Sequence, residues 1–207
     1  MARVDRRPRQ RLPIAQRRAA ILTAAQAAFA TAPYDQVSLA GIATTAGASE
    51  ALVHRYFATK SELYVEIVEH AAAELEERWR AAAAAAGGPS ADGWTRVALA
   101  IDAYLDFVAV SGAGWASPLR APDAGFSPAR QVRTEARERF VGYVRDTLDR
   151  PAGDAENQAL HGYLGFLDSA ALTWSRAGCP DGQRSGLITM ALGALSGALA
   201  ALDAEDE

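Results

Sequence analysis

The side chains best suited to recognising another molecule stand close together near the N-terminal end of the chain. Glu50, His54 and Arg55 fall within six residues, with Ala51 between them. A guanidinium can donate two hydrogen bonds to guanine O6 and N7, a carboxylate can accept one from cytosine N4, and an imidazole can do either. A helix that displays these residues could therefore contact base edges. The plainer alternatives are that Glu50 only favours a first helical turn and that Arg55 is a solvated cation.

Two short helices separated by a glycine turn are expected to position these residues. Ser38 and Ser49 each precede a short apolar stripe and are suited to capping a helix, and Gly47 lies between the two stripes. Val53 and Phe57 are four apart and should pack inward. The pattern predicts a helix-turn-helix whose second helix, about residues 49–57, enters the major groove of DNA.

Other polar groups nearby could hold DNA phosphates without distinguishing bases. The candidates are Ser38, Thr44, Thr45, Ser49, Tyr56 and Lys60. Lys60 is the only lysine of the chain, and it lies at the start of a longer helix, where backbone amides also favour an anion. Four arginines of the N-terminal arm could add phosphate or minor-groove contacts: Arg6, Arg7, Arg9 and Arg11.

The distribution of charge supports a polyanionic partner at this end. The net charge of the chain is -4, but residues 1–60 hold nine Lys/Arg against three Asp/Glu, and residues 61–207 hold twelve against twenty-two. A basic N-terminal part on an acidic remainder is typical of proteins that bind nucleic acid with one end. The alternative is a basic tail that only increases solubility.

Residues 17–64 resemble the N-terminal domain of the TetR family. The resemblance rests on IL-x-AA-x-x-x-F in the first helix, on Tyr34, on the capped IA-x-x-AG turn, and on the pair Tyr56-Phe57 followed by Lys60. It implies a DNA-binding transcriptional regulator in which Lys60 grips the DNA backbone. The sequence departs from the family pattern at Glu50, Ala51, His54 and Ala32-Pro33, which leaves the operator sequence open.

The remainder of the chain predicts helices only, so the expected fold is all-α. We expect a flexible basic arm over 1–12, a helix-turn-helix domain over 13–60 that begins with a helix from about Pro13 to Ala32, and a helical body over 61–207. The expected body helices cover about 61–86, 92–110, 127–149, 154–177 and 181–202. Residues 111–126 are rich in glycine and proline and predict a long connection, and Ser127-Pro128 is expected to open the helix after it.

The last two helices are apolar nearly all round and are expected to pair with a second copy of the chain. A helix without a polar face must be covered on every side, and the small residues Gly193 and Gly197 allow close helix approach. The family resemblance also implies such a four-helix interface. The expected contacts are Leu160, Tyr163, Leu164, Leu167, Ala171, Leu192, Gly193, Leu195, Gly197 and Leu199. The alternative is a core within one subunit.

Aromatic side chains of the body could line a pocket for a small apolar or amphipathic effector, which the resemblance places among these helices. The candidates are Trp94, Tyr104, Phe107, Trp115, Phe140, Tyr143 and Trp174. Taken singly, each is more often a core residue than a wall of a ligand site. Arg139, Asp106 and Asp168 are polar neighbours of apolar stripes. A ligand that prefers one of two dimer conformations would then release DNA, as in a repressor.

Other classes of protein receive less support from the sequence. One cysteine and three scattered histidines favour neither a disulfide framework nor a metal site, and we expect no cofactor. An enzyme would need paired acids or a nucleophile with a base, and the nearest pair, His161 and Asp168, is seven residues apart. Residues 186–202 are apolar but short for a membrane span, so a cytoplasmic protein is expected. A helical DNA-binding dimer without an effector is the main alternative.

Overall fold

The chain is built from helices throughout the part that the structure describes. The computed structural model describes residues 13–120 and 129–204, and for residues 111–120 it describes the helix but not the side chains. Over these ranges it has eight α-helices and two 3₁₀ segments: α1 (Ile14–Thr31), η1 (Tyr34–Gln36), α2 (Leu39–Thr45), α3 (Glu50–Tyr56), α4 (Lys60–Ala85), η2 (Gly88–Ser90), α5 (Gly93–Arg120), α6 (Arg130–Thr147), α7 (Asp154–Arg176) and α8 (Asp181–Asp203). The described residues contain no strand, so the predicted all-α class is confirmed.

Hydroxyl side chains define the starts of three helices in the N-terminal part. The Oγ atoms of Ser38 and Ser49 and Oγ1 of Thr59 accept hydrogen bonds from backbone amides three residues ahead, at 3.1, 3.2 and 3.0 Å. Gly47 has φ +62°, a left-handed conformation that costs glycine little, and it separates α2 from α3. Local chemistry thus produces the short helix pair that the sequence predicts.

The prediction of a connection over residues 111–126 was wrong for its first ten residues, because α5 continues to Arg120. Two glycines and Pro118 made the segment look like a loop, but propensity is a weak guide where tertiary packing favours a longer helix. Helices α1 and α4 both pack against α5. Helix α6 begins at Arg130, and the expected cap at Ser127-Pro128 lies outside the described residues.

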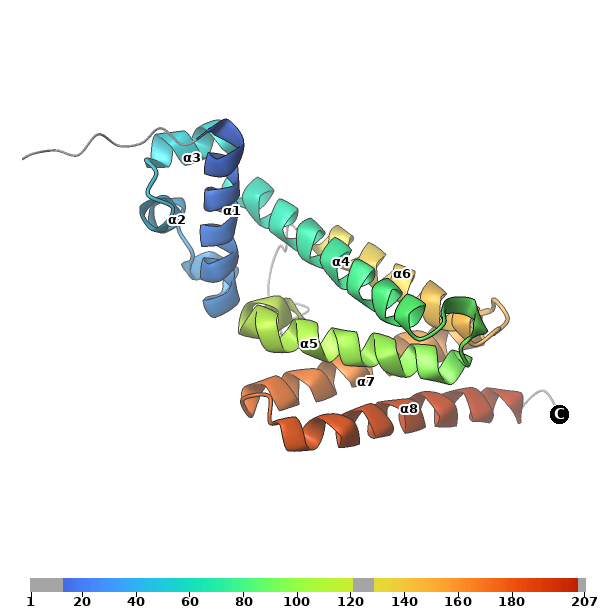
Figure 1. Ribbon diagram of the computed structural model, residues 1–207. Helices are drawn as coiled ribbons and strands as arrows, with labels where there is room; N and C mark the ends of the chain where they lie inside the picture. The colour runs from blue at the N-terminus through green and yellow to red at the C-terminus, as the bar shows by residue number, and fades with distance from the viewer. Residues whose placement is uncertain (1–12, 121–128, 205–207) are drawn as a thin grey trace, which may run out of the picture.

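Two hydrophobic cores divide the molecule into a head and a body. The head core joins α1, α2 and α3 through residues such as Ile21, Ile42 and Val53, and it includes Leu63 to Val68 of α4 and Ala129 beside α6. The body core joins α4 to α8, from Leu75 to Leu199. Figure 1 shows α4 running from the head into the body. The head core therefore extends beyond the boundary at residue 60 that the sequence suggested.

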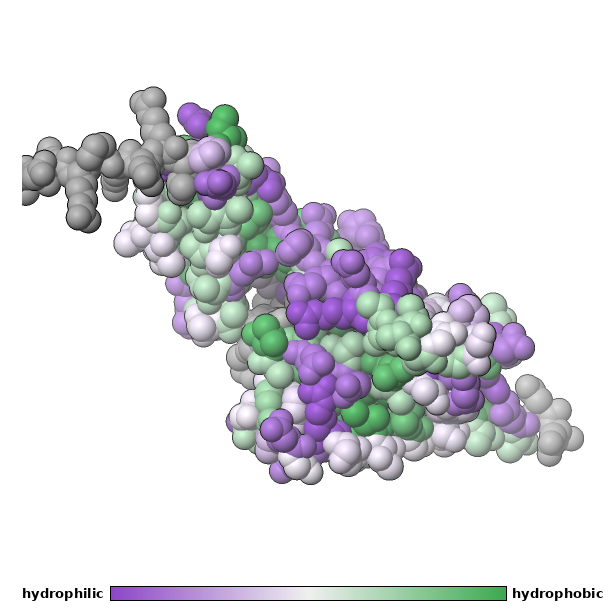
Figure 2. Space-filling model, viewed as in Figure 1, coloured by the Kyte–Doolittle hydropathy of each residue, from purple (hydrophilic) through white to green (hydrophobic). Residues whose placement is uncertain are grey.

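Helix α8 is only partly covered by its own subunit. Its buried stripe consists of Leu187, Ala191, Leu195 and Leu199, each four residues from the next. Among the described helices it is the one that is long and apolar enough for a membrane span, with 22% of that stretch buried, and a helix of this kind is weak support for a span. In Figure 2 its outer edge is largely pale, whereas much of α4 is hydrophilic.

Candidate functional site

Helix α3 presents one face to solvent and the other to the head core. Glu50, Ala51, His54 and Arg55 are exposed, whereas Val53 is fully buried. Phe57 follows the helix and is 1% exposed. The four residues expected to contact bases therefore lie on the outward face of the second helix of the motif. Their contact with DNA remains a prediction.

The side chains on this face have only loose contacts with the protein among the described residues. The Arg55 guanidinium lies 5.7 Å from the ring centroid of Tyr56, which is partly buried. His54 Nε2 lies 4.0 Å from Glu50 Oε1, and His54 Nδ1 lies 3.3 Å from the carbonyl oxygen of Ala58. Such weak contacts leave the polar atoms of α3 accessible to an external partner.

The hydroxyl groups expected at phosphates also serve the helices that carry them. Thr44 Oγ1 donates to the carbonyl oxygen of Ala40 at 2.9 Å, and Thr45 Oγ1 donates to that of Gly41 at 3.2 Å. Ser38 and Ser49 act as caps. Their hydroxyl oxygens remain at the exposed edge of α2 and α3, so phosphate contacts from these residues stay a prediction.

Lys60 has a role within the head that the sequence did not indicate. Its Nζ donates to the carbonyl oxygens of Tyr34 and Val37 at 2.9 and 3.0 Å, and it lies 4.2 Å from the ring centroid of Tyr34. Two of the three ammonium protons are thus used to hold η1 against α4. The predicted phosphate contact would have to use the third. The arm arginines Arg6, Arg7, Arg9 and Arg11 lie outside the described residues.

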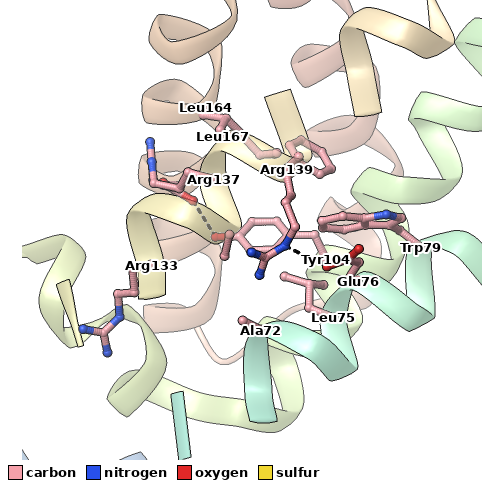
Figure 3. Close-up of a pocket in the computed structure, with 13 residues that line it drawn as sticks. Ala72, Leu75, Glu76, Trp79, Tyr104, Arg133, Arg137, Arg139, Leu164 and Leu167 are labelled. Carbon is pink, nitrogen blue, oxygen red and sulfur yellow. Dashed lines mark hydrogen bonds and ion pairs between the residues drawn. The ribbon is translucent and has the colours of Figure 1, made fainter. Parts of the chain in front are cut away.

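A cavity lies in the body between α4, α5, α6 and α7 (Figure 3). Its free space is about 80 Å³. Its apolar walls are Ala72, Leu75, Trp79, Ala136, Phe140, Leu164 and Leu167, and its polar groups are Glu76, Tyr104, Arg133, Arg137, Arg139 and Asp168. Apolar walls with a few polar groups are typical of a small-molecule site.

Two of the aromatic residues predicted for an effector pocket, Tyr104 and Phe140, line this cavity. Tyr143 does not line the cavity but packs against Trp79, which does; their ring centroids are 5.8 Å apart. Trp79 itself was missed, although its spacing of four from Leu75 places both on one side of α4. The alanine-rich sequence around Trp79 suggested a plain helix instead.

Three other aromatic candidates, Phe107, Trp174 and Trp94, do not line this cavity, so their contact with an effector remains a prediction. Phe107 lines a separate cleft between α1, α4 and α5, and Trp174 lines a surface groove between α7 and α8. Trp94 is 37% exposed. The side chain of Trp115 lies outside the described residues. Aromatic character alone could not separate cavity walls from core and surface positions.

A buried hydrogen-bond network crosses the cavity wall. Tyr104 Oη donates to Asp168 Oδ1 at 2.7 Å, and Arg137 forms an ion pair with the same carboxylate. Burial, and then the negative charge of Asp168, raise the pKa of Tyr104 well above its usual value. The phenol therefore stays protonated and keeps its role as a donor.

Most of the predicted dimer contacts are already buried within one subunit. Leu160, Tyr163, Leu164, Leu167, Ala171, Leu195 and Leu199 are at most 6% exposed and belong to the body core. Their contact with a second copy remains a prediction. Gly193 and Gly197 are exposed and Leu192 is partly exposed, and a Cβ added at either glycine would meet nothing within 4 Å.

The residues weighed for an enzyme do not form a catalytic pair. His161 Nε2 lies 3.3 Å from Glu138 Oε1, whereas Asp168 is engaged by Tyr104 and Arg137. Within the described ranges, no three His, Cys, Asp or Glu side chains lie close enough together to hold a metal ion.

The fold and the exposed face of α3 define an all-helical protein with a helix-turn-helix head. Residues 21–67 match the model of a family described as bacterial regulatory proteins, tetR family. The match spans most of α1, the helix-turn-helix and the start of α4, so the N-terminal domain is similar to that of TetR-family regulators. The resemblance seen in the sequence is therefore confirmed.

Solved structures share this fold along nearly the whole chain. A tetR-family transcriptional regulator from Streptomyces coelicolor is 22% identical, with a TM-score of 0.77 over 94% of this chain and 85% of that one. A TetR-like transcriptional regulator from Rhodococcus sp. RHA1 is 20% identical, with a TM-score of 0.72 over 92% and 99%. The regulator FadR from Bacillus subtilis, solved in complex with stearoyl-CoA, is 19% identical, with a TM-score of 0.65 over 87% and 97%. No curated protein matches the sequence.

Proposed function

We propose that this protein is a ligand-responsive repressor that binds a specific DNA operator as a homodimer in the cytoplasm. The observation that carries the proposal is the outward face of α3, where Glu50, Ala51, His54 and Arg55 are exposed on a helix whose other face is buried. A helix held in this way can enter the major groove, where side chains distinguish base pairs. Arg55 would contact guanine.

A second copy is proposed to cover the exposed side of α8. Met190 is 51% exposed, and around it lie the small residues Gly186, Gly193 and Gly197, over which a partner helix could pack closely. Two heads joined in this way would contact half-sites about 34–36 Å apart. One head alone would make too few base contacts for useful specificity.

The body cavity is the proposed effector site. Helices α4 and α6 both line it, and both also contribute to or adjoin the head core, so a ligand that shifts them would alter the distance between the two heads. The complex of the similarly folded FadR with stearoyl-CoA supports a ligand site in a body of this kind.

The proposal is tested by titrating labelled DNA fragments with the purified protein. We expect fragments from the intergenic region upstream of its own gene to bind at least 100-fold more tightly than random sequence of equal length and salt concentration. Equal affinity for both would exclude a specific regulator. Analytical ultracentrifugation of the protein alone should give a dimer, and a persistent monomer would contradict the proposed assembly.

A DNA-binding dimer without an effector is the second candidate. The small free volume of the cavity, about 80 Å³, favours it, because pockets for drug-sized ligands usually measure about 300–1,000 Å³. The two candidates differ in whether any compound that binds the body lowers affinity for the operator.

A further inference from the structure

We infer that the ligand of the body cavity is an amphipathic anion, with its apolar part against Trp79 and Phe140 and its charged group at Arg139. The identity of the cavity as an effector site rests on the proposed function. The chemical class of the ligand is inferred from the charges at the cavity alone.

The two carboxylates at the cavity are both engaged by arginines of α6. Arg139 pairs with Glu76, and Arg137 pairs with Asp168. Asp168 already forms an ion pair with Arg137 and accepts a hydrogen bond from the hydroxyl of Tyr104. An additional cation would therefore find no available carboxylate at Asp168, because Arg137 already compensates its charge.

Glu76 is shared by two arginines from different helices. Its Oε2 accepts from Arg139 Nε on α6 at 2.8 Å, and its Oε1 lies 2.7 Å from Arg80 Nη2 on α4. Two guanidinium groups on one carboxylate leave about one positive charge uncompensated at this side of the cavity. Glu76 is 18% exposed, so water screens this charge only in part.

Arg139 is well placed to meet a ligand. It uses Nε for Glu76, and no contact of its two Nη groups with another described residue is shown; the side chain is 43% exposed. Figure 3 shows its guanidinium lying across the cavity in front of Tyr104, with Trp79 and Leu75 beside it. The planar fork of these Nη groups matches a carboxylate.

The walls below the guanidinium suit an apolar chain or ring. Trp79 and Phe140 lie 4.9 Å apart between ring centroids at 59°, and Leu75, Leu164 and Leu167 complete the apolar lining. Apart from Trp79 Nε1, which is buried and has no partner among the described residues, these side chains carry no hydrogen-bonding group, so a polar ligand body would lose its hydration with little compensation. An apolar body with one anionic end satisfies both parts of the cavity.

The inference is tested with three probes that share one chain and differ in the end group: octanoate, 1-octanol and octylamine. Binding to the full-length protein is measured by calorimetry at neutral pH. We expect octanoate to bind at least 10-fold more tightly than either of the others. Equal binding of all three, preference for octylamine, or no binding of octanoate would overturn the inference.

Two variants distinguish an effect of the Arg139 charge on ligand binding from an effect of misfolding. In Arg139→Gln the preference for octanoate over octanol should fall about 10-fold, and in Glu76→Gln octanoate should bind several-fold more tightly, because Arg139 is released from its partner. A gain of affinity cannot result from misfolding. Arg78→Gln is the matched control, since Arg78 pairs with Glu74 on the same helix at 2.6 Å and does not line the cavity. An unchanged octanoate affinity in both Arg139→Gln and Glu76→Gln would contradict the inference.

Operator binding is then measured with and without octanoate, so that the two proposals can fail separately. Selective octanoate binding that leaves DNA affinity unchanged would support the ligand class and contradict the effector role. Loss of DNA affinity with all three probes equally would support the effector role and overturn the ligand class.

Discussion

Helix α3 of the head and the helices of the body use their charged side chains in opposite ways. On α3 of the head, Glu50 and His54 approach each other no closer than 4.0 Å, and Arg55 rests on the ring of Tyr56. In the body, arginines hold elements together: Arg184 of α8 bonds Asp102 and Asp106 of α5, and Arg150, between α6 and α7, bonds Glu156 of α7 and Asp203 of α8. The comparison suggests that body charges mainly hold helices together, whereas those of α3 are available to a partner.

The cavity arginines lie between these two uses. Arg137 has the carboxylate of Asp168 as its own partner, as the other body arginines do, but Arg139 shares the carboxylate of Glu76 with Arg80. The difference between the two regions is therefore one of degree, and variants in each region test how far it extends.

The largest effect is expected from removing the main aromatic residue of the head core. Phe57→Ala should reduce the stability of the head by about 3–5 kcal/mol and abolish DNA binding, because Phe57 is 1% exposed. Trp79, Trp94 and Trp174 lie in the body, and none of the four tryptophans of the sequence lies within α1, α2 or α3, so fluorescence reports mainly on the body. We expect the fluorescence-monitored unfolding transition to shift less than the one monitored by circular dichroism.

Leu105→Ala is the matched control for this variant, since Leu105 is fully buried in the body core. It should shift the fluorescence transition instead, by about 2–5 kcal/mol. Equal shifts from Phe57→Ala and Leu105→Ala in both signals would show that head and body unfold as one unit.

A smaller effect is expected at Lys60, where stability and DNA binding should fall together. Lys60→Met removes two charge-assisted hydrogen bonds to the carbonyl groups of Tyr34 and Val37, each of which contributes at most about 1.5–3 kcal/mol at this partly exposed site. We expect the melting temperature to fall and affinity for all DNA sequences to fall alike. Reduced DNA affinity at an unchanged melting temperature would assign Lys60 to phosphate contact alone.

Two tyrosines of the body should respond in opposite directions to loss of the hydroxyl group. Tyr104→Phe removes the donor to Asp168 and should cost about 1 kcal/mol. The Tyr163 hydroxyl is buried and has no hydrogen-bond partner among the described residues, so Tyr163→Phe should be neutral or stabilise the protein by about 1 kcal/mol. Urea unfolding of both variants measures the difference, and a clear loss of stability in Tyr163→Phe would point to a partner for that hydroxyl.

The smallest effect concerns alkaline pH. Burial raises the pKa of both Tyr104 and Tyr163 above that of tyrosine in the unfolded chain, so the folded state holds these protons more firmly. Their contribution to stability is complete below the unfolded-state pKa, about 10, and is lost as the pH rises above it. The unfolding free energy should therefore fall less steeply above pH 10 in the double variant with phenylalanine at both positions. Identical slopes would contradict the assignment.

The head could be predicted closely from the sequence because its signals are local. Ser38, Gly47 and Ser49 define α2 and α3 within a dozen residues, and a spacing of four places Val53 and Phe57 inward. The base-contacting candidates followed directly from that orientation. No local signal showed that Lys60 reaches Tyr34, 26 residues earlier.

The body was less predictable because its features depend on contacts between distant segments. The apolar faces of α7 and α8 did not reveal that Leu160 and Leu195 pack within the subunit, because a buried leucine has the same sequence pattern in either kind of interface. Likewise, the cavity brings Trp79, Tyr104 and Asp168 together from three helices. The periodicity of a single helix does not predict which residues of different helices come together.

The central claim, that α3 contacts base edges, is tested most directly by coupling Arg55 to a guanine of the operator. A site is selected from random DNA, and 7-deazaguanine, which lacks the N7 acceptor, is placed at each guanine in turn. At one position in each half-site, we predict that the change weakens wild-type binding about 10-fold and leaves binding of Arg55→Ala almost unchanged. Equal losses for both proteins at every guanine would contradict the claim.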